Sequence, residues 1–365
     1  MLDYLKKEKV LCIAWILALI SMFIIHPDSQ YIEYIDFKVL ALLFCLMLVV
    51  KGFQRIGLFN LLIEKMSVHI KDSRSLSQML IFCCFFLSML ITNDVALLTF
   101  VPFAILSLEL CGQEKLMIQV IVLQTIAANL GSMFTPIGNP QNLYLFSISS
   151  MGMKEFFGTM FPLTLVSCVG IFAATFLIPK TEICMKIEDQ VEISERKELI
   201  VYCVLFVLNL LVVFRVLSWV PVLLITIFMV IFIKRVELFK QVDYALLITF
   251  VGFFVFVGNI GRIPWFSEIL GQMIKGKEIL VGTVFSQFLS NVPAALLLSG
   301  FTENYKELLI GVNIGGLGTL IASMASLISY KFYAQSEDAK KGKYLAVFTG
   351  YNVVGLIVLL LVTLV

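Results

Sequence analysis

Two short polar breaks interrupt apolar stretches at corresponding places in the two halves of this 365-residue chain. Their residues are Thr92, Asn93 and Asp94 in the first half, and Ser290, Asn291 and the nearby Pro293 in the second. An Asn amide offers two donors and an acceptor, and the neighbouring hydroxyls add further polar groups. These residue types suit either the binding of an ion or polar solute, or the capping of broken helices. The sequence leaves both interpretations open.

Asp94 is the acidic residue of the first break. An ionised carboxylate at the centre of a membrane segment costs about 2.5–3.5 kcal/mol on insertion scales, so such residues usually face a cavity or a partner. No Lys or Arg occurs between Arg74 and Lys115 to neutralise it. The functional interpretation is a coupling site at which Asp94 holds Na+ or takes up a proton. The alternative is an Asp that caps a half-helix beginning at Val95, and the two roles are compatible.

A second, Gly-rich break follows each of the first ones. In the first half this Gly-rich break contains Asn129, Gly131, Ser132, Thr135, Pro136, Gly138, Asn139, Pro140 and Asn142. In the second half it contains Asn313, Gly315, Gly316, Gly318 and Thr319. Glycine permits positive φ and close approach, and proline prevents a continuous helix. Freed carbonyls can coordinate a cation, and half-helix N-termini attract an anion. The alternative is close helix packing through glycine. We expect a Na+ site near Asn93, Asp94 and Asn129.

Composition indicates that these breaks lie inside a membrane. Hydrophobic residues make up 60% of the chain and charged residues 14%, and the mean hydropathy is +1.00. Eight cysteines without a CxxC spacing predict neither a disulfide framework nor a transition-metal site, and we expect no cofactor other than a coupling ion. The whole chain, residues 1–365, is predicted to be a single all-α polytopic membrane domain. We expect spans near 10–26, 37–51, 116–149, 156–178, 198–214, 219–233, 243–260, 306–330 and 344–364.

Two further apolar segments, 76–108 and 279–302, carry the polar breaks at their middle. Each arm has about 12 to 16 residues, which is too short to span alone, so re-entrant hairpins are predicted. The stretches 53–70 and 262–277, just before the hairpins, have the mixed charge and helical spacing of interfacial helices. The Gly-rich breaks predict that two of the spans are discontinuous helices.

The distribution of basic residues predicts the orientation. Segments 1–9, 51–75, 109–115, 179–197, 234–241 and 331–343 hold 20 of the 27 Lys and Arg residues. The positive-inside rule then places the N-terminus in the cytoplasm and the C-terminus outside the cell membrane. In this layout residues 1–178 and 198–365 form an inverted repeat around a cytoplasmic linker, 179–197. The two hairpins enter from opposite faces.

The breaks resemble signatures of the ion transporter superfamily, which includes citrate and dicarboxylate carriers, divalent anion:sodium symporters, arsenite permeases and some sodium/proton antiporters. The resemblance is carried by Thr92-Asn93-Asp94, the run from Asn129 to Asn142 and Ser290-Asn291-Val292-Pro293. It implies two hairpin tips that meet two unwound helices near the midplane, and a homodimer. In the dicarboxylate/sodium branch both tips carry Ser-Asn-Thr, whereas here the first triplet ends in Asp94 and the second continues as Val292-Pro293. The Thr-Asn-Asp triplet with the Gly138-Asn139-Pro140-Gln141-Asn142 run is more similar to the arsenite permeases.

These features predict a secondary active transporter rather than an enzyme. The substrate is expected to be a small anion or oxyacid, such as citrate, a dicarboxylate or arsenite, moved by symport or antiport with Na+ or H+. The hairpins and the cores of both broken spans contain no Lys or Arg, so a multiply charged anion would meet no fixed buried cation. No HExxH, GxSxG or nucleotide-binding loop occurs, and no nucleic-acid partner is expected. The alternatives are a Na+/H+ antiporter without an organic substrate and a passive channel.

Overall fold

The computed structural model describes residues 9–58, 61, 70–183, 196–336 and 339–364. The described part of the first half contains α2 (Lys9–Ile24), α3 (Gln30–Glu33), α4 (Phe37–Arg55), α6 (Ser73–Ile91), α7 (Asn93–Leu110), η1 (Glu114–Leu116), α8 (Met117–Ser132), α9 (Pro140–Ile148) and α10 (Met153–Thr175). The second half contains α11 (Arg196–Val213), α12 (Trp219–Phe232), η2 (Val236–Gln241), α13 (Tyr244–Gly261), α14 (Pro264–Ile274), α15 (Glu278–Leu289), α16 (Asn291–Ser299), α17 (Tyr305–Ile314), α18 (Met324–Tyr333) and α19 (Lys341–Val362).

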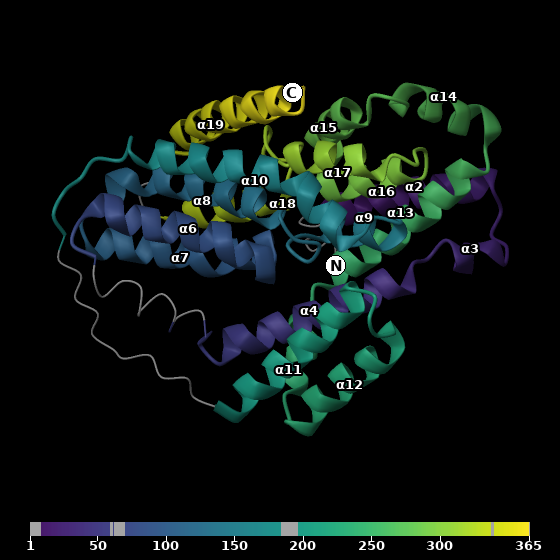
Figure 1. Ribbon diagram of the computed structural model, residues 1–365, viewed down its shortest axis with the longest axis horizontal. Helices are drawn as coiled ribbons and strands as arrows, with labels where there is room; N and C mark the ends of the chain where they lie inside the picture. The colour runs from purple at the N-terminus through teal and green to yellow at the C-terminus, as the bar shows by residue number, and fades with distance from the viewer. Residues whose placement is uncertain (1–8, 59–60, 62–69, 184–195, 337–338, 365) are drawn as a thin grey trace.

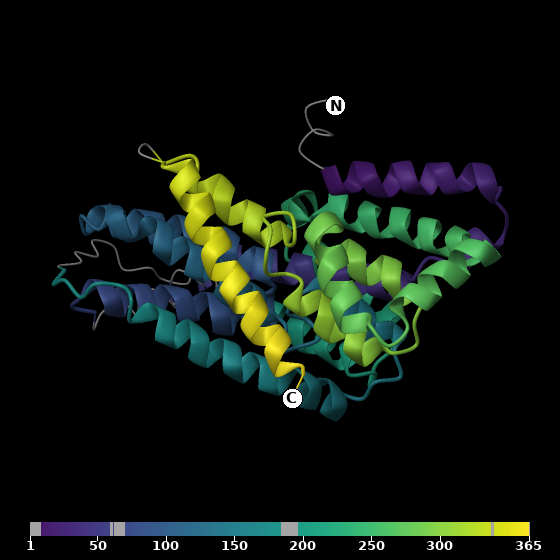
Figure 2. The same cartoon turned by 90° about the horizontal axis from the view of Figure 1, so that it is seen from above.

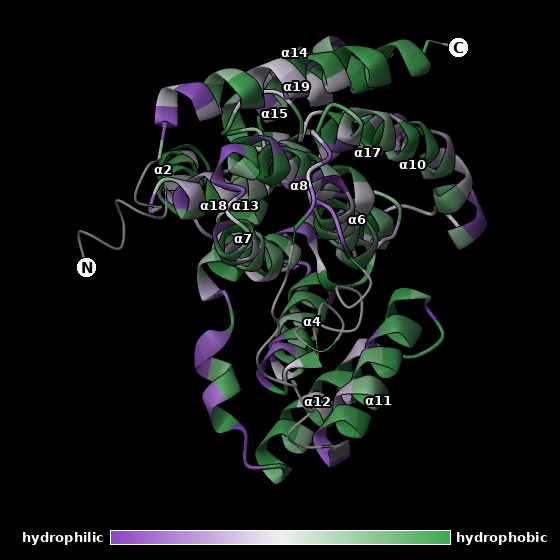
Figure 3. Cartoon of the chain, turned by 90° about the vertical axis from the view of Figure 1, so that its left-hand side faces the viewer, coloured by the Kyte–Doolittle hydropathy of each residue, from purple (hydrophilic) through white to green (hydrophobic). Residues whose placement is uncertain are grey.

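Seven of the described helices are long and apolar enough to cross a membrane. The prediction of an all-α multi-pass membrane protein is thereby confirmed. Figure 3 shows hydrophobic colour along most of α11, α12 and α19, with hydrophilic residues gathered at helix ends and loops. This pattern is expected of helices that face lipid, where every backbone polar group must be satisfied within its own segment.

Polar residues at the borders of the apolar runs decide where several helices begin. Their side chains accept the backbone N–H three residues later, which satisfies one of the free donors of the first turn. These N-cap residues are Asp36 before α4, Asp72 before α6, Asn139 before α9, Asp243 before α13 and Asn304 before α17.

The helices pack in four groups, two of which combine helices of both halves (Figure 1). α6, α7 and α10 lie against α8, and α4 packs with α11 and α12. α15, α16 and α17 pack together, and α2 lies along α13. Figure 2 shows α19 running diagonally across the outside of the molecule, where it contacts α8 and α10.

The first hairpin is longer than expected. α6 has 19 residues and α7 has 18, so the predicted arm length of about 12 to 16 residues is wrong here. Asp72 caps α6 before the apolar run begins, and α7 continues through polar residues to Leu110. At a rise of about 1.5 Å per residue, each arm approaches the roughly 30 Å of a hydrocarbon core. The arms of the second hairpin, with 12 and 9 residues, are shorter.

Both long segments with Gly-rich breaks are interrupted. The segment predicted at 116–149 divides into α8 and α9, with residues 133–139 between them. The segment predicted at 306–330 divides into α17 and α18, with residues 315–323 between them. α14 occupies the stretch predicted as an interfacial helix at 262–277. Most of the stretch predicted at 53–70 and residues 184–195 of the linker lie outside the described residues.

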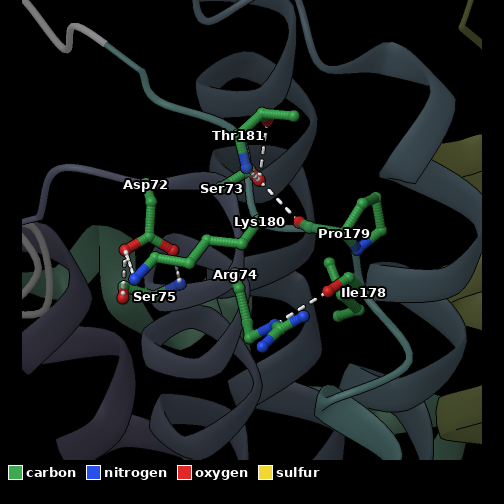
Figure 4. A network of polar contacts seen from close by, with 8 residues as sticks. All are labelled: Asp72, Ser73, Arg74, Ser75, Ile178, Pro179, Lys180 and Thr181. Carbon is green, nitrogen blue, oxygen red and sulfur yellow. Dashed lines mark hydrogen bonds and ion pairs between the residues drawn. The ribbon is translucent and has the colours of Figure 1, made fainter.

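The chain after α10 is fastened to the base of the first hairpin (Figure 4). Ser73 donates its backbone N–H to Thr181 O at 2.9 Å, and Ile183 donates to Lys71 O at 3.0 Å. The Ser73 hydroxyl and the Arg74 guanidinium donate to the carbonyls of residues 179 and 178, each at 2.8 Å. The start of the linker and the start of α6 are therefore held as one unit.

The carboxylate of Asp72 makes this unit sensitive to acid. The backbone N–H of Ser75 bonds the carboxylate and, with the Ser75 hydroxyl and Lys180, holds the pKa of Asp72 below its usual range. A group with a depressed folded-state pKa stabilises the fold above its unfolded pKa, and that contribution is lost as pH falls through the folded pKa. We expect Asp72→Asn to lower the unfolding temperature at pH 7. Below about pH 4 the unfolding temperature of the variant should decline less steeply with falling pH than that of the wild type. Parallel declines in variant and wild type would contradict this role.

Candidate functional site

The two hairpin tips have the same backbone conformation. Thr92 has φ 73° and ψ 151°, and Ser290 has φ 77° and ψ 154°. This region is almost confined to glycine, and another residue held there stores about 1–3 kcal/mol of strain. Two residues with side chains therefore adopt the same costly turn at the polar break of each half.

Matched hydrogen bonds fix both tips. The backbone N–H of Asn93 donates to Gly138 O at 3.1 Å, and that of Asn291 donates to Ala322 O at 2.9 Å. Each Asn Oδ1 then accepts the next backbone N–H along the chain, at 3.0 Å and 2.9 Å. The capping interpretation of the tip amides is therefore correct for their oxygen atoms. It is wrong for Asp94, because α7 begins at Asn93 and the Asp94 carboxylate accepts no hydrogen bond from a described residue.

The Gly-rich breaks are tied to the tips in the same manner. Thr135 donates its hydroxyl to Met89 O, and Thr319 donates its hydroxyl to Gln287 O at 3.0 Å. Both acceptors lie three residues before the strained tip residue. Gln287 was not among the predicted site residues, but its amide also donates to Gly315 O and Leu317 O and accepts from the Thr319 backbone. The signal for this role was the presence of a polar side chain, Gln287, within the otherwise apolar first arm of the second hairpin.

Two buried asparagines join the halves reciprocally. Asn129 Oδ1 accepts from Asn93 Nδ2 at 3.0 Å and from Ser323 Oγ at 2.9 Å. Asn313 Oδ1 accepts from Asn139 Nδ2 at 3.1 Å, and its own amide donates to Asn142 Oδ1 at 2.7 Å. Each Asn thus reaches across to the second break of the other half. The predicted residues Asn93, Asn129, Asn139, Asn142 and Asn313 therefore meet in one polar centre.

The glycines of the breaks are needed mainly for close approach. A Cβ at Gly131 would lie 2.0 Å from Phe85 O, and one at Gly138 would lie 2.1 Å from Ser132 O. Gly315 and Gly316 are similarly crowded by Ser286 and Asn291. Of the five glycines predicted for these breaks, only Gly318 has a positive φ, 113°. The prolines differ in position: Pro136 lies in the break, Pro140 starts α9, and Pro293 lies in the first turn of α16.

A cavity of about 240 Å³ opens beside the first tip. Its polar lining consists of Thr92, Asp94, Asn139, Lys51, Gln241 and Asp243. Gln241 and Asp243 are exposed and mark its mouth, whereas Asn139 and Pro140 are buried and mark its inner end. The rest of the wall is aliphatic, from α4, α6, α7, α9 and α13. Asn139 therefore connects the cavity to the polar centre.

The cavity corrects the expectation that an anion would meet no fixed cation. Lys51 at the end of α4 is half-buried and lines the wall. From the sequence, Lys51 was expected outside the membrane because it follows the apolar run of residues 37–50. Ser290 and Asn291 do not line this cavity and are buried, with 1% and 5% of their surfaces exposed. The two tips thus have the same backbone but different surroundings.

Glycine at either tip is expected to relieve the strain. Thr92→Gly and Ser290→Gly should each raise the free energy of unfolding by about 1 kcal/mol, because glycine adopts this conformation at little cost. Thermal unfolding of the purified protein in detergent checks this. Thr92→Ser retains the strain and the hydroxyl and serves as the matched control, with no gain expected. A loss of stability in both glycine variants would show that the side chains support the turns.

Residues 6–304 match the family described as citrate transporter. The chain is also 34% identical over 349 residues to an uncharacterized transporter of Methanocaldococcus jannaschii, with 93% of each chain covered. This chain belongs to the citrate transporter family. The predicted resemblance to the ion transporter superfamily is thereby confirmed, and both the family and this archaeal relative are named as transporters.

Other relatives extend the similarity of this citrate transporter family member. The inner membrane protein YbiR of Escherichia coli is 30% identical over 326 residues, with 86% of this chain and 84% of the relative covered. The silicon efflux transporter LSI3 of rice, Oryza sativa subsp. japonica, is 31% identical over 139 residues, which cover 38% of this chain and 28% of the relative. The family member is thus similar to two proteins named as transporters and to one named as an inner membrane protein.

Proposed function

We propose that the protein is a secondary active transporter that moves a small oxyacid or weakly charged anion by alternating access, driven by a Na+ or H+ gradient. The observation that carries this proposal is Asp94, a carboxylate without a described hydrogen-bond partner that lines a cavity beside a strained hairpin tip. Acidic side chains inside membrane proteins usually belong to ion or solute pathways. The cell membrane is the proposed location.

The two halves are proposed to form an inverted repeat, residues 1–178 and 198–365, whose hairpins enter from opposite faces. The equal torsions of Thr92 and Ser290 and the reciprocal bonds of Asn129 and Asn313 support this arrangement. With the N-terminus in the cytoplasm, the mouth of the cavity at Gln241 and Asp243 faces the cytoplasm. The described conformation then corresponds to an inward-facing state, and a homodimer remains a proposal from the family resemblance.

Asp94 is proposed as the coupling residue in place of the wider Na+ site around Asn93, Asp94 and Asn129. The amide oxygen of Asn129 already accepts two hydrogen bonds, and that of Asn93 accepts the backbone N–H of Asp94. The carboxylate oxygens of Asp94 have no such donors among the described residues. The carboxylate oxygens of Asp94 are therefore the acceptors that can bind a coupling proton or Na+.

The size of the cavity favours a small substrate. Its 240 Å³ lies below the roughly 300–1,000 Å³ of most ligand pockets. The name of the family refers to citrate, a tricarboxylate, and the name of the rice relative refers to silicon. The volume of the cavity therefore favours a small oxyacid over a tricarboxylate such as citrate.

A Na+/H+ antiporter without an organic substrate is the second candidate. It is favoured by the two carboxylates, Asp94 and Asp243, that share the cavity with a single lysine. This function predicts cation exchange that is indifferent to added anions.

Uptake into proteoliposomes tests the proposal. Radiolabelled phosphate, succinate, citrate, arsenite and silicic acid are offered separately under an imposed Na+ or H+ gradient. Accumulation above the external concentration, abolished by an ionophore that dissipates the gradient, is expected for at least one small solute. Currents that reverse at the Nernst potential without accumulation would indicate a channel. Cation exchange alone would indicate the antiporter.

A further inference from the structure

We infer that Lys51 of α4 pairs with the transported solute and selects a small, singly charged oxyanion over dianions and trianions. This inference rests on the proposed function and names the substrate class of the same cavity. Lys51 lies on α4, outside both hairpins and both broken helices, which are the segments from which the sequence predicted the site.

The ammonium group of Lys51 is held at the wall by neutral partners. Lys51 Nζ donates to Gln54 Oε1 at 3.1 Å, and Gln54 Nε2 donates to Thr99 Oγ1 at 2.9 Å. The Thr99 hydroxyl in turn donates to Val95 O on the first turns of α7. This chain of bonds positions Lys51 relative to the helix that carries Asp94. Gln54 uses one of the three N–H donors of the ammonium group, which leaves donors for a solute.

The two arginines near this end of the molecule, Arg55 and Arg235, are already paired with carboxylates. Glu198 bonds Arg55 at 2.9 Å and Arg235 at 2.6 Å, and Arg55 also lies 3.4 Å from Glu237. Lys51 forms no ion pair with a described carboxylate. Among the described basic side chains, it is the one that lines the cavity. Its charge is therefore available to an anion.

The charges of the cavity set the valence of that anion. With Asp94 and Asp243 ionised, the cavity carries one positive and two negative groups, and an entering anion is repelled. When a proton or Na+ neutralises Asp94, the positive charge of Lys51 and the negative charge of Asp243 cancel. One negative charge on the solute can then pair with Lys51. A dianion or trianion would place further negative charge against Asp243 in a confined, partly desolvated space. Cation and monoanion are thus expected to bind together.

Binding and uptake by four proteins test this inference: wild type, Lys51→Gln, Lys51→Arg and Lys240→Gln. Lys240 is an exposed lysine of η2 that does not line the cavity, so its replacement removes the same charge without touching the site. The probes are the monoanions nitrate, lactate and dihydrogen phosphate, the dianion succinate, the trianion citrate, and neutral silicic acid. Thermal unfolding without solute verifies that each variant folds.

The wild type is expected to accumulate a monoanion in preference to succinate and citrate. Lys51→Gln should weaken its apparent affinity by about 10- to 100-fold, the usual effect of a hydrogen bond to a charged group. Lys51→Arg and Lys240→Gln should retain affinity within a few-fold. A wild type that takes only silicic acid or prefers multivalent anions would overturn the inference, as would unchanged affinity in a folded Lys51→Gln. Absence of gradient-driven accumulation of every probe by the wild type would instead refute the proposed function.

Discussion

Asp94→Asn is expected to uncouple transport from its driving gradient. The substitution keeps the size and polarity of the side chain but removes the charge that a proton or Na+ must neutralise. Coupling free energies between sites commonly correspond to about 5- to 150-fold, and gradient-driven accumulation in proteoliposomes should fall by a factor in this range. Residual uptake should no longer respond to the imposed Na+ or H+ gradient.

Glu109→Gln is the matched control for this prediction. Glu109 is an exposed acidic residue near the end of α7, the helix that also carries Asp94, and it does not line the cavity. Its replacement should leave accumulation unchanged. If Asp94→Asn accumulated solute as the wild type does, with the same dependence on pH and Na+, coupling would have to reside elsewhere.

Gly131→Ala is expected to cause the largest loss of stability among single methyl additions to the breaks. The new Cβ would lie 2.0 Å from Phe85 O and 2.8 Å from Ser88 Oγ, where α8 crosses α6. Because the obstructing atom is a backbone carbonyl, no side-chain rotation relieves the overlap. We expect a decrease of at least ~3 kcal/mol in the free energy of unfolding, measured by thermal or denaturant unfolding in detergent.

Gly170→Ala supplies the comparison. Gly170 lies in α10 with nothing within 4 Å of a built Cβ, so alanine should change stability by less than about 1 kcal/mol, in the stabilising direction. Equal stability of the Gly131 and Gly170 variants would mean that α6 and α8 can separate without cost. The crowded contact would then have no structural importance.

The sequence predicted the class of fold because apolar run length is a direct consequence of membrane thickness. It also predicted where the helices break, since Gly, Pro and Asn clusters are incompatible with continuous helix. It did not predict the length of α6, because Asp72 extends that helix beyond the apolar run by capping it. Helix capping and hydropathy are separate signals, and the lengths of the hairpin arms were predicted from hydropathy alone.

The composition of the site was predicted less completely. The polar centre contains the predicted asparagines because burying an amide without hydrogen-bond partners is costly, and clustering lets the amides satisfy one another. Ser323 was missed, and so was Ser326, whose Oγ accepts from Asn129 Nδ2 at 3.4 Å. Isolated serines beside a break carry little information without the chain that folds onto them. Lys51 and Asp243 were missed for another reason: each lies at the end of a helix, and only tertiary packing brings them to Asp94.

The reciprocal bonds of Asn129 and Asn313 have a consequence for biogenesis. During synthesis the first half enters the bilayer before Ser323, Ser326 and Asn313 have left the ribosome, so its buried amides must wait for partners. Each half therefore supplies hydrogen-bond partners that the other half needs in order to fold. The two halves, expressed as separate polypeptides, should therefore be degraded when alone and accumulate together when both are present.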